Sequence, residues 1–264
     1  MSTIDPGLDP TIRTRQPADL AAPAWKRHAH GHHWRTQAEE FDGAKLGFWL
    51  FLTTEVLLFG GIFCAYFIFR TFYPAAFAEG SAALDWRIGA INTAVLLLSS
   101  YTMACSIYCM QTNQQKRAQI NLWATIAFGA VFVLLKFFLE YMPKWSGWFL
   151  AFDPFLHYET TKSAYGGLLV YVEGYGGKRP GQLFDYPFAT DPNMPLWWSV
   201  YYSGTVIHAA HVLIGMVLIA RVAIKGLKGH YGPTYYTGVE IAGLYWHLVD
   251  LIWIFLFPLL YLIH

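Results

Sequence analysis

The sequence has little charge for its length. Only 13% of its 264 residues are charged, while 55% are hydrophobic; an ordinary soluble domain carries about a quarter charged residues. The formal net charge is only +1, which gives no case for nucleic-acid binding. The composition therefore excludes an ordinary water-soluble domain and favours a chain that is dissolved mainly in lipid.

Cysteine is also scarce, and a cleavable signal peptide is missing. The three cysteines, Cys64, Cys105 and Cys109, all lie inside apolar runs, so a disulfide scaffold is not expected. Cys105 and Cys109 share a helix face, where packing is favoured over metal ligation. The first forty or so residues are polar and lack the basic start, short apolar stretch and small-residue cleavage site of a signal peptide. We expect the first apolar run to act as the insertion signal.

Five long apolar runs are present instead. About 20 residues at 1.5 Å each cross a hydrocarbon core about 30 Å thick, so runs of this length are typical of spanning helices. The runs cover residues 46–69, 88–110, 119–142, 196–220 and 239–263. They do not alternate as the strands of a membrane barrel would. We predict an all-α membrane protein, with a polar tail at residues 1–43 and a bundle of five transmembrane helices within residues 44–264.

The orientation follows from the lysines and arginines that flank these runs, because they are retained on the cytoplasmic side. Three flanks on one side are basic, with Lys26, Arg27, Arg35, Lys45, Lys116, Arg117, Arg221, Lys225 and Lys228. The segment at residues 143–195 spreads four basic residues over its length. The N-terminus is therefore predicted to be cytoplasmic, and both the C-terminus and the long loop at residues 143–195 periplasmic.

Two polar segments invite further hypotheses. The periplasmic loop is rich in Gly, Pro, Tyr and Asp; we expect a short hairpin around residues 168–172 and contact with an outer-facing partner. The tail contains His28, His30, His32 and His33, which could hold a transition metal or simply form part of a mobile polar tail.

Ionisable residues at membrane depth are costly unless they pair, neutralise or face a cavity. The runs contain Glu55, Lys136, Glu140, His208, His211, Glu240, His247 and Asp250. Glu240, His247 and Asp250 follow the spacing of one helix face, as do His208 and His211. Counting 1.5 Å per residue places Glu55, His211 and His247 roughly 12–14 Å from the cytoplasmic ends of their helices. We therefore expect a polar layer in which His211 pairs with His247 or Glu55, and His208 pairs with Asp250.

Three hypotheses remain open for this layer. It could bind haem b between His211 and His247, relay protons through a buried Glu55 carboxyl, or form a hydrogen-bonded network that fixes helix packing. Asn92, with Thr93, Ser99 and Ser100, suits the packing network. Lys136 and Glu140 are expected as a pair at the outer end of their helix. Arg221 and Lys225, at the cytoplasmic interface, could hold anionic lipid headgroups or serve only to set the topology.

Short motifs in all five runs resemble cytochrome c oxidase subunit III. The last run contains Tyr245, Trp246, His247, Val249, Asp250 and Trp253, in the order of the family's closing helix. His208, His211, Val212 and Gly215 follow the family pattern of the preceding helix. Glu55 stands where the family has a membrane-embedded glutamate. The chain resembles the five-helix bacterial form, although its outer loop looks longer than the family pattern and Lys136 departs from the mitochondrial version.

The resemblance implies an accessory subunit without haem or copper, in an oxidoreductase complex of the bacterial inner membrane. Subunit I, its main partner, and subunit II would hold the haem and copper, and a periplasmic cytochrome c would be a further partner. The subunit would stabilise subunit I, hold phospholipid and support proton uptake through Glu55, a residue that reacts with hydrophobic carbodiimides in this family. Alternatives are the homologous subunit of a quinol oxidase or nitric oxide reductase, a stand-alone haem b or metal-binding membrane protein, and a proton-coupled transporter.

The predicted orientation can be tested by labelling. Lys178→Cys lies in the loop that we expect to be periplasmic, and Lys116→Cys in a turn that we expect to be cytoplasmic. An impermeant thiol reagent added to intact cells should label Lys178→Cys and reach Lys116→Cys only after the membrane is opened. Labelling of both from outside would contradict the topology.

Overall fold

The computed structural model describes residues 34–146, 148–150, 163–166, 169–172 and 191–263. Its elements are α2 (Gln37–Phe72), α3 (Pro74–Ala82), α4 (Trp86–Gln111), α5 (Gln115–Leu135), the π-helical turn η2 (Lys136–Tyr141), α6 (Met142–Ser146), β1 (Trp148–Leu150), β2 (Ser163–Gly166), β3 (Leu169–Val172), α7 (Met194–Leu227) and α8 (Thr237–Tyr261). Five segments are long and apolar enough to span a membrane. The prediction of five spanning helices is confirmed.

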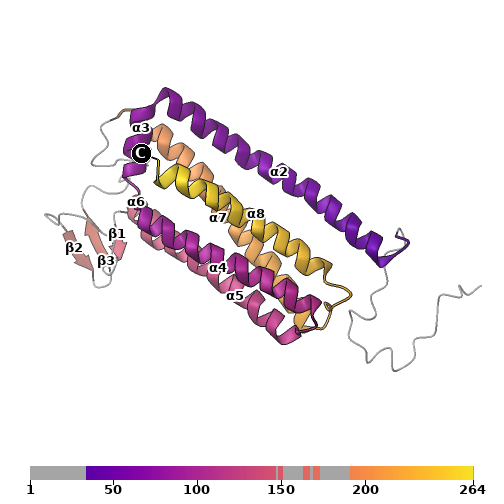
Figure 1. Ribbon diagram of the computed structural model, residues 1–264. Coiled ribbons are helices and arrows are strands. Elements are labelled where there is room, and N and C mark those ends of the chain that lie inside the picture. Colours follow the sequence, from indigo (N-terminus) through magenta and orange to yellow (C-terminus); the bar gives the residue numbers. More distant parts are fainter. Residues whose placement is uncertain (1–33, 147, 151–162, 167–168, 173–190, 264) are drawn as a thin grey trace, which may run out of the picture.

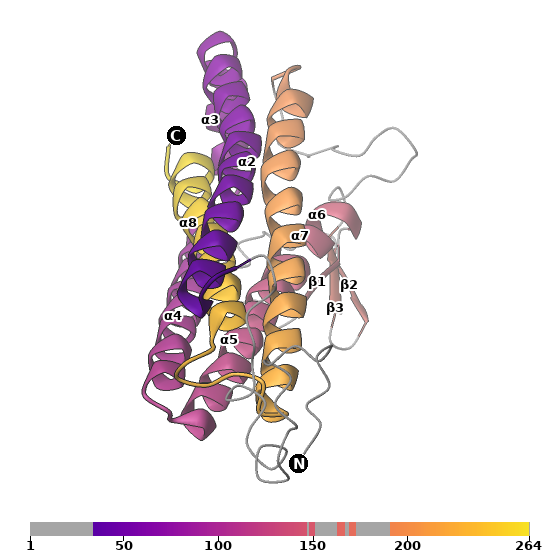
Figure 2. The same ribbon diagram turned by 90° about the vertical axis from the view of Figure 1, so that its right-hand side faces the viewer.

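Four of these helices form a compact group, and the fifth runs along its side. In Figure 1, α4, α5, α7 and α8 lie side by side, while α2 runs along the top of this group and packs on α7 and α8. Figure 2 shows the same arrangement from a second direction. One end of the bundle holds α3, α6, the strands and the end of α8, and we call it the sheet end. The other holds the α4–α5 and α7–α8 connections, and we call it the turn end.

Side-chain caps set where two of the spanning helices, α2 and α4, begin. Thr36 caps α2 by accepting a hydrogen bond from the Glu39 backbone nitrogen at 3.2 Å, so α2 begins at Gln37, well before the apolar run. Asp85 caps α4 in the same way, accepting from the Arg87 nitrogen at 2.8 Å. The apolar run marks only the part of a helix that suits hydrocarbon. The helices themselves extend further.

Two tryptophans of α8 form the centre of the four-helix group. Trp246 packs where Gly129 of α5 and Gly215 of α7 leave room, and its Nε1 donates to Ser99 Oγ of α4 at 3.0 Å. Seven residues later, Trp253 Nε1 donates to Thr93 Oγ1 of α4 at 3.0 Å. Each indole is fully buried. One face of α8 therefore contacts all three neighbouring helices.

A small antiparallel sheet lies outside the spanning helices. The strand order is β1-β3-β2, and β2 pairs with β3 in the register Tyr165↔Val170. This pairing is the hairpin predicted around residues 168–172. β1 follows α6 directly and contacts both α6 and η2, so the sheet is attached to the end of the third spanning segment.

Glycine at position 215 should be required by the Trp246 contact. A Cβ atom there would lie 2.8 Å from Trp246 Cε3, so Gly215→Ala must displace the indole or the helix. We expect a loss of about 1–3 kcal/mol of stability, because overpacking a filled core forces strain. The measurement is thermal unfolding in detergent, with Gly60→Ala as the control, since a Cβ at Gly60 meets nothing within 4 Å. Equal melting temperatures for the two variants would contradict the packing role.

Candidate functional site: polar contacts inside the helix bundle

Glu55 of α2 and His211 of α7 form a polar contact near the middle of the bundle. His211 Nε2 lies 2.9 Å from Glu55 Oε2. His211 Nδ1 lies 2.7 Å from the carbonyl oxygen of Ile207, one turn earlier in α7. The side chains are 15% and 16% exposed. Glu55 is thus partly exposed and not fully buried, and the predicted pairing of His211 with Glu55 is present.

This geometry determines how many protons the pair holds. The Ile207 carbonyl can only accept, so Nδ1 carries a hydrogen and donates it. Nε2 then accepts from a protonated Glu55, or donates, as imidazolium, to the Glu55 carboxylate. Either way one proton lies between Nε2 and Oε2. Both forms have no net charge, which makes the pair tolerable at membrane depth.

Aromatic rings surround this pair and fix the position of α2. The Phe59 ring meets the His211 imidazole edge-on, with ring centroids 5.3 Å apart. Tyr245 of α8 stacks on the imidazole with ring centroids 6.5 Å apart. Tyr245 also stacks with Phe51 of α2 at 6.3 Å. Glu55 and His211 therefore lie at a junction of α2, α7 and α8.

The other two predicted histidine contacts are wrong. His247 does not meet His211; its Nδ1 lies 2.7 Å from Ser100 Oγ of α4. His208 does not bond Asp250, since neither of its ring nitrogens has a hydrogen-bond partner among the described residues. His208 is fully buried between the rings of Phe132 and Trp253, with centroids at 5.6 and 5.1 Å.

Helix geometry explains these errors. Residues 208 and 211 are three apart, so their side chains point roughly 60° apart around the helix axis. That rotation directs His211 towards α2 and His208 into the core between α5 and α8. Counting residues along a helix gives depth, but it does not give the direction around the axis.

The small polar residues of α4 serve helix packing as predicted, with one exception. Thr93 and Ser99 accept hydrogen bonds from the two α8 tryptophans, and Ser100 bonds His247. Asn92 is fully buried, yet neither atom of its amide has a hydrogen-bond partner among the described residues. Three of the four residues therefore join α4 to α8.

Glu240 belongs to a different contact from the one we predicted. Its Oε1 accepts a hydrogen bond from Lys45 Nζ of α2 at 2.6 Å. Phe41 of α2 packs edge-on against Tyr236, just before α8, with ring centroids 5.7 Å apart. These two contacts hold the turn end of α2 against the start of α8. In the sequence Lys45 indicates topology, and its place at the same end of the bundle as Glu240 is the signal that could have indicated this contact.

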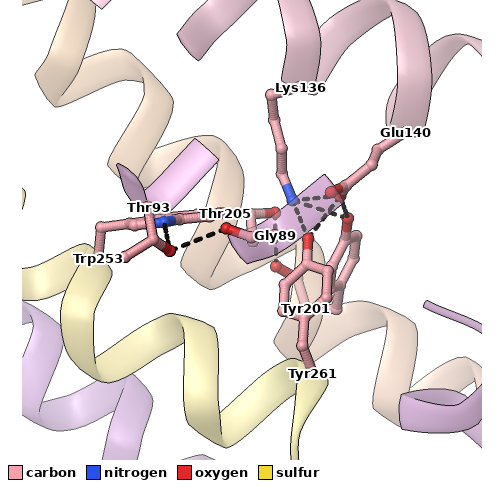
Figure 3. Close-up of polar contacts among 8 residues, drawn as sticks. All are labelled: Gly89, Thr93, Lys136, Glu140, Tyr201, Thr205, Trp253 and Tyr261. Atoms are coloured by element: carbon pink, nitrogen blue, oxygen red, sulfur yellow. Dashed lines mark hydrogen bonds and ion pairs between the residues drawn. The ribbon is translucent and has the colours of Figure 1, made fainter. Parts of the chain in front are cut away.

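Lys136 and Glu140 form a buried ion pair in η2, near the sheet end. Each side chain is 2% exposed. Figure 3 shows both converging on the hydroxyl groups of Tyr201 and Tyr261. Both hydroxyls donate to Glu140 Oε2, at 2.7 Å for Tyr201 and 2.5 Å for Tyr261. Lys136 Nζ also donates to both phenol oxygens.

This cluster, which we call the lysine knot, is defined by Lys136, Glu140, Tyr201 and Tyr261. An ammonium group has three hydrogens, and here they meet three acceptors: one carboxylate and two phenols. The sequence predicted the ion pair and missed the two tyrosines. Tyr201 lies near the start of α7 and Tyr261 at the end of α8. Both are therefore at the same end of the bundle as the ion pair, and this position could have indicated them. The knot joins η2 to both of these helices.

The remaining predicted site residues lie apart from these contacts. Arg221 and Lys225 are exposed near the turn end of α7. The four tail histidines fall outside the described residues. Within the part of the chain that the structure describes, no group of three or more His, Cys, Asp or Glu side chains is arranged to hold a metal ion.

A comparison with known protein families identifies this arrangement of five helices. The family model for cytochrome c oxidase subunit III matches residues 24–146 and 186–264. The chain belongs to this family. The match includes all five spanning helices and leaves out residues 147–185, which contain the three strands. The small sheet therefore lies outside the part of the chain that the family model matches.

Relatives support the assignment over nearly the whole chain. Cytochrome c oxidase subunit 3 of Synechocystis is 29% identical over 259 residues, covering 97% of this chain and 89% of the relative. The Thermostichus vulcanus protein of the same name is 30% identical, covering 89% and 91%. A probable quinol oxidase subunit 3 of Staphylococcus haemolyticus is 28% identical, covering 83% and 88%.

The lysine knot predicts an unusual ranking of variants. Lys136→Met leaves the Glu140 charge buried alone, and Glu140→Gln leaves the Lys136 charge alone; each should cost about 3–5 kcal/mol. The double variant Lys136→Met/Glu140→Gln leaves neither charge and should be more stable than either single variant. The melting temperature of the detergent-solubilised protein checks this order. Additive losses in the double variant would show that the two charges do not depend on each other.

Because the contact between Glu55 and His211 needs only one hydrogen between the two atoms, we expect position 55 to tolerate a neutral side chain that can donate a hydrogen bond. The amide of Glu55→Gln can still donate to Nε2 of neutral His211, so assembly should be retained. Glu55→Leu leaves Nε2 unpaired and should cost about 0.6 kcal/mol, the average for a hydrogen bond between membrane helices. Subunit yield and melting temperature are the measurements. Failure of Glu55→Gln to assemble would mean that the pair must be charged.

Proposed function

We propose that this chain is the non-redox accessory subunit III of a respiratory haem-copper oxygen reductase, packed beside the catalytic subunit I. The observation that carries the proposal is the family match on all five spanning helices. The relatives are named as the third subunit of cytochrome c or quinol oxidases. In this proposal the haem, the copper and the oxygen chemistry belong to subunits I and II.

The histidine contacts support a structural and proton-linked role for this chain over a haem-binding one. An axial haem ligand needs a free imidazole nitrogen. Both nitrogens of His211 are already engaged, by Glu55 and by Ile207, so His211 has no free nitrogen to serve as one of the two axial ligands. The haem b hypothesis required His211 and His247 to face each other, and they do not.

Glu55 is the residue through which we propose that proton uptake is supported. It lies at the junction of α2, α7 and α8, is 16% exposed, and has Oε2 2.9 Å from His211 Nε2, so a proton can pass between these two atoms without creating net charge. A neutral pair of this kind can accept a proton at one atom and release one at the other. In this proposal Glu55 helps to stabilise the catalytic subunit and to supply protons to it.

We further propose that the turn end faces the cytoplasm of a bacterium and the sheet end the periplasm, so that the chain lies in the inner membrane. Among the described residues, the turn end carries Arg35, Lys45, Lys116, Arg117, Arg221, Lys225 and Lys228, and the sheet end carries Arg70, Arg87 and Lys144 besides the paired Lys136. This difference follows the positive-inside bias. The loop at residues 143–195 would then meet a periplasmic partner, either subunit II or a cytochrome c.

A quinol oxidase is the second candidate complex. It is favoured by the quinol oxidase relatives, which match almost as well as the cytochrome c oxidase ones, at 28% against 29–30% identity. The electron donor binds elsewhere in such complexes, so this subunit alone does not distinguish them.

The deciding experiment is mass analysis of the complex purified by a tag on this chain after gentle solubilisation. We expect a haem-copper catalytic subunit in equal amount, with the absorption of haem following that subunit. The control is the chain separated from its partners, whose spectrum should show no haem. A chain that purifies alone and carries stoichiometric haem, or that drives proton flux in liposomes without partners, would refute the proposal.

Lipid binding at the turn end gives a separate prediction. Arg221 and Lys225 are exposed one turn apart on α7, and each basic residue attracts an anionic headgroup by about 1 kcal/mol. Arg221→Ala/Lys225→Ala should lower copurified anionic phospholipid severalfold. The control, Lys116→Ala/Arg117→Ala, removes the same charge from the α4–α5 connection. It should lower the amount of copurified anionic phospholipid less. Equal lipid content in both double variants and the unaltered chain would leave these residues a topological role only.

A further inference from the structure

His247 has one hydrogen-bonding nitrogen that the described structure does not use. Its Nδ1 contacts Ser100 Oγ at 2.7 Å, which holds the ring in one orientation against α4. No hydrogen bond to Nε2 is formed by the described residues. The side chain is partly exposed at the edge between α8 and α4. It lies ten residues after Thr237, so it is roughly 15 Å from the start of α8.

The surface around His247 is apolar. Leu251 and Ile254 continue the same face of α8 and are 51% and 43% exposed, and Leu97 of α4, one turn before Ser100, is 50% exposed. In a bilayer this surface lies in hydrocarbon. An imidazole nitrogen without a partner is unfavourable in that environment, because hydrocarbon offers it no hydrogen bond.

The possible sources of a partner at this depth are few. Lipid acyl chains have no hydrogen-bonding group, and headgroups lie about 15 Å from the midplane of a hydrocarbon core about 30 Å thick. Water is excluded from a lipid-facing surface. A polar side chain on another transmembrane helix satisfies the nitrogen at the right depth, and such side chains join membrane helices in this way.

We propose that a transmembrane helix of the catalytic subunit packs on the α4–α8 face and presents a hydrogen-bonding side chain to Nε2 of His247. The proposal rests on the proposed function and specifies the face and the residue of contact. It also accounts for the difference between His247 and the Glu55–His211 pair. Glu55 and His211 satisfy each other inside the chain, whereas His247 is oriented by Ser100 with one atom left at the surface.

Site-specific photocross-linking tests the face. A benzophenone amino acid placed at Leu251, in the complete complex, should cross-link to the catalytic subunit. The matched control is the same group at Leu134 of α5, an apolar residue 53% exposed on a helix that packs on α4 and α7; it should cross-link less. Cross-links from Leu251 only to lipid, to quinone or to a second copy of this chain would overturn the proposal.

Substitution of His247 tests the hydrogen bond. His247→Phe keeps a ring and removes both nitrogens, and should lower retention of the catalytic subunit in a detergent challenge by about threefold, and by at most about twentyfold. His247→Gln keeps a donor and an acceptor and should restore part of the retention. His230→Phe is the control, because it makes the same change in the connection between α7 and α8, outside the spanning helices.

The results separate this inference from the function on which it rests. Absence of a catalytic subunit from the unaltered complex would refute the proposed function. Its presence, with equal retention in His247→Phe and His230→Phe, would overturn the inference alone. A folding defect is recognised by circular dichroism and melting temperature of the isolated variants, and His247→Gln provides the test if His247→Phe does not fold.

Discussion

The packing of two tryptophans against glycine and small polar residues holds the four-helix group together. Trp246 and Trp253 lie two turns apart on α8 and contact α4, α5 and α7 through a single face. Each indole has a large apolar surface and one N–H that needs an acceptor. The hydroxyl groups of Ser99 and Thr93 supply these acceptors, which is why the two rings can be fully buried at membrane depth. The positions of the histidines follow from this packing, since Trp253 covers His208 and leaves His211 directed towards α2.

The polar contacts around this centre differ in what they join. The lysine knot connects η2 to α7 and α8 near the sheet end, Glu55 joins α2 to α7 in the middle, and Lys45 joins α2 to α8 at the turn end. A hydrocarbon solvent gives little driving force for apolar surfaces to associate. Helix α2, which packs on only part of the bundle, therefore depends on hydrogen bonds and ring contacts at several depths.

The spanning helices could be predicted from the sequence because hydrocarbon imposes one length and one composition on them. The contact between Glu55 and His211 could be predicted because both residues are polar and lie at the same depth. Depth was insufficient for His208 and His247, whose partners depend on the direction in which each side chain points. Tyr201 and Tyr261 were missed for another reason. A tyrosine in an apolar run resembles any aromatic core residue until a buried charge is found beside its hydroxyl group.

The short distance between Glu55 and His211 has a consequence for energy coupling. A charge that crosses the whole membrane gains about 2.3 kcal/mol per 100 mV of membrane potential. Moving a charge between His211 Nε2 and Glu55 Oε2, 2.9 Å apart, crosses at most about a tenth of a hydrocarbon core about 30 Å thick. The electrical work is therefore about 0.2 kcal/mol per 100 mV, below the thermal energy of about 0.6 kcal/mol. The membrane voltage leaves this proton almost unaffected, and its position is set by the groups that surround the pair.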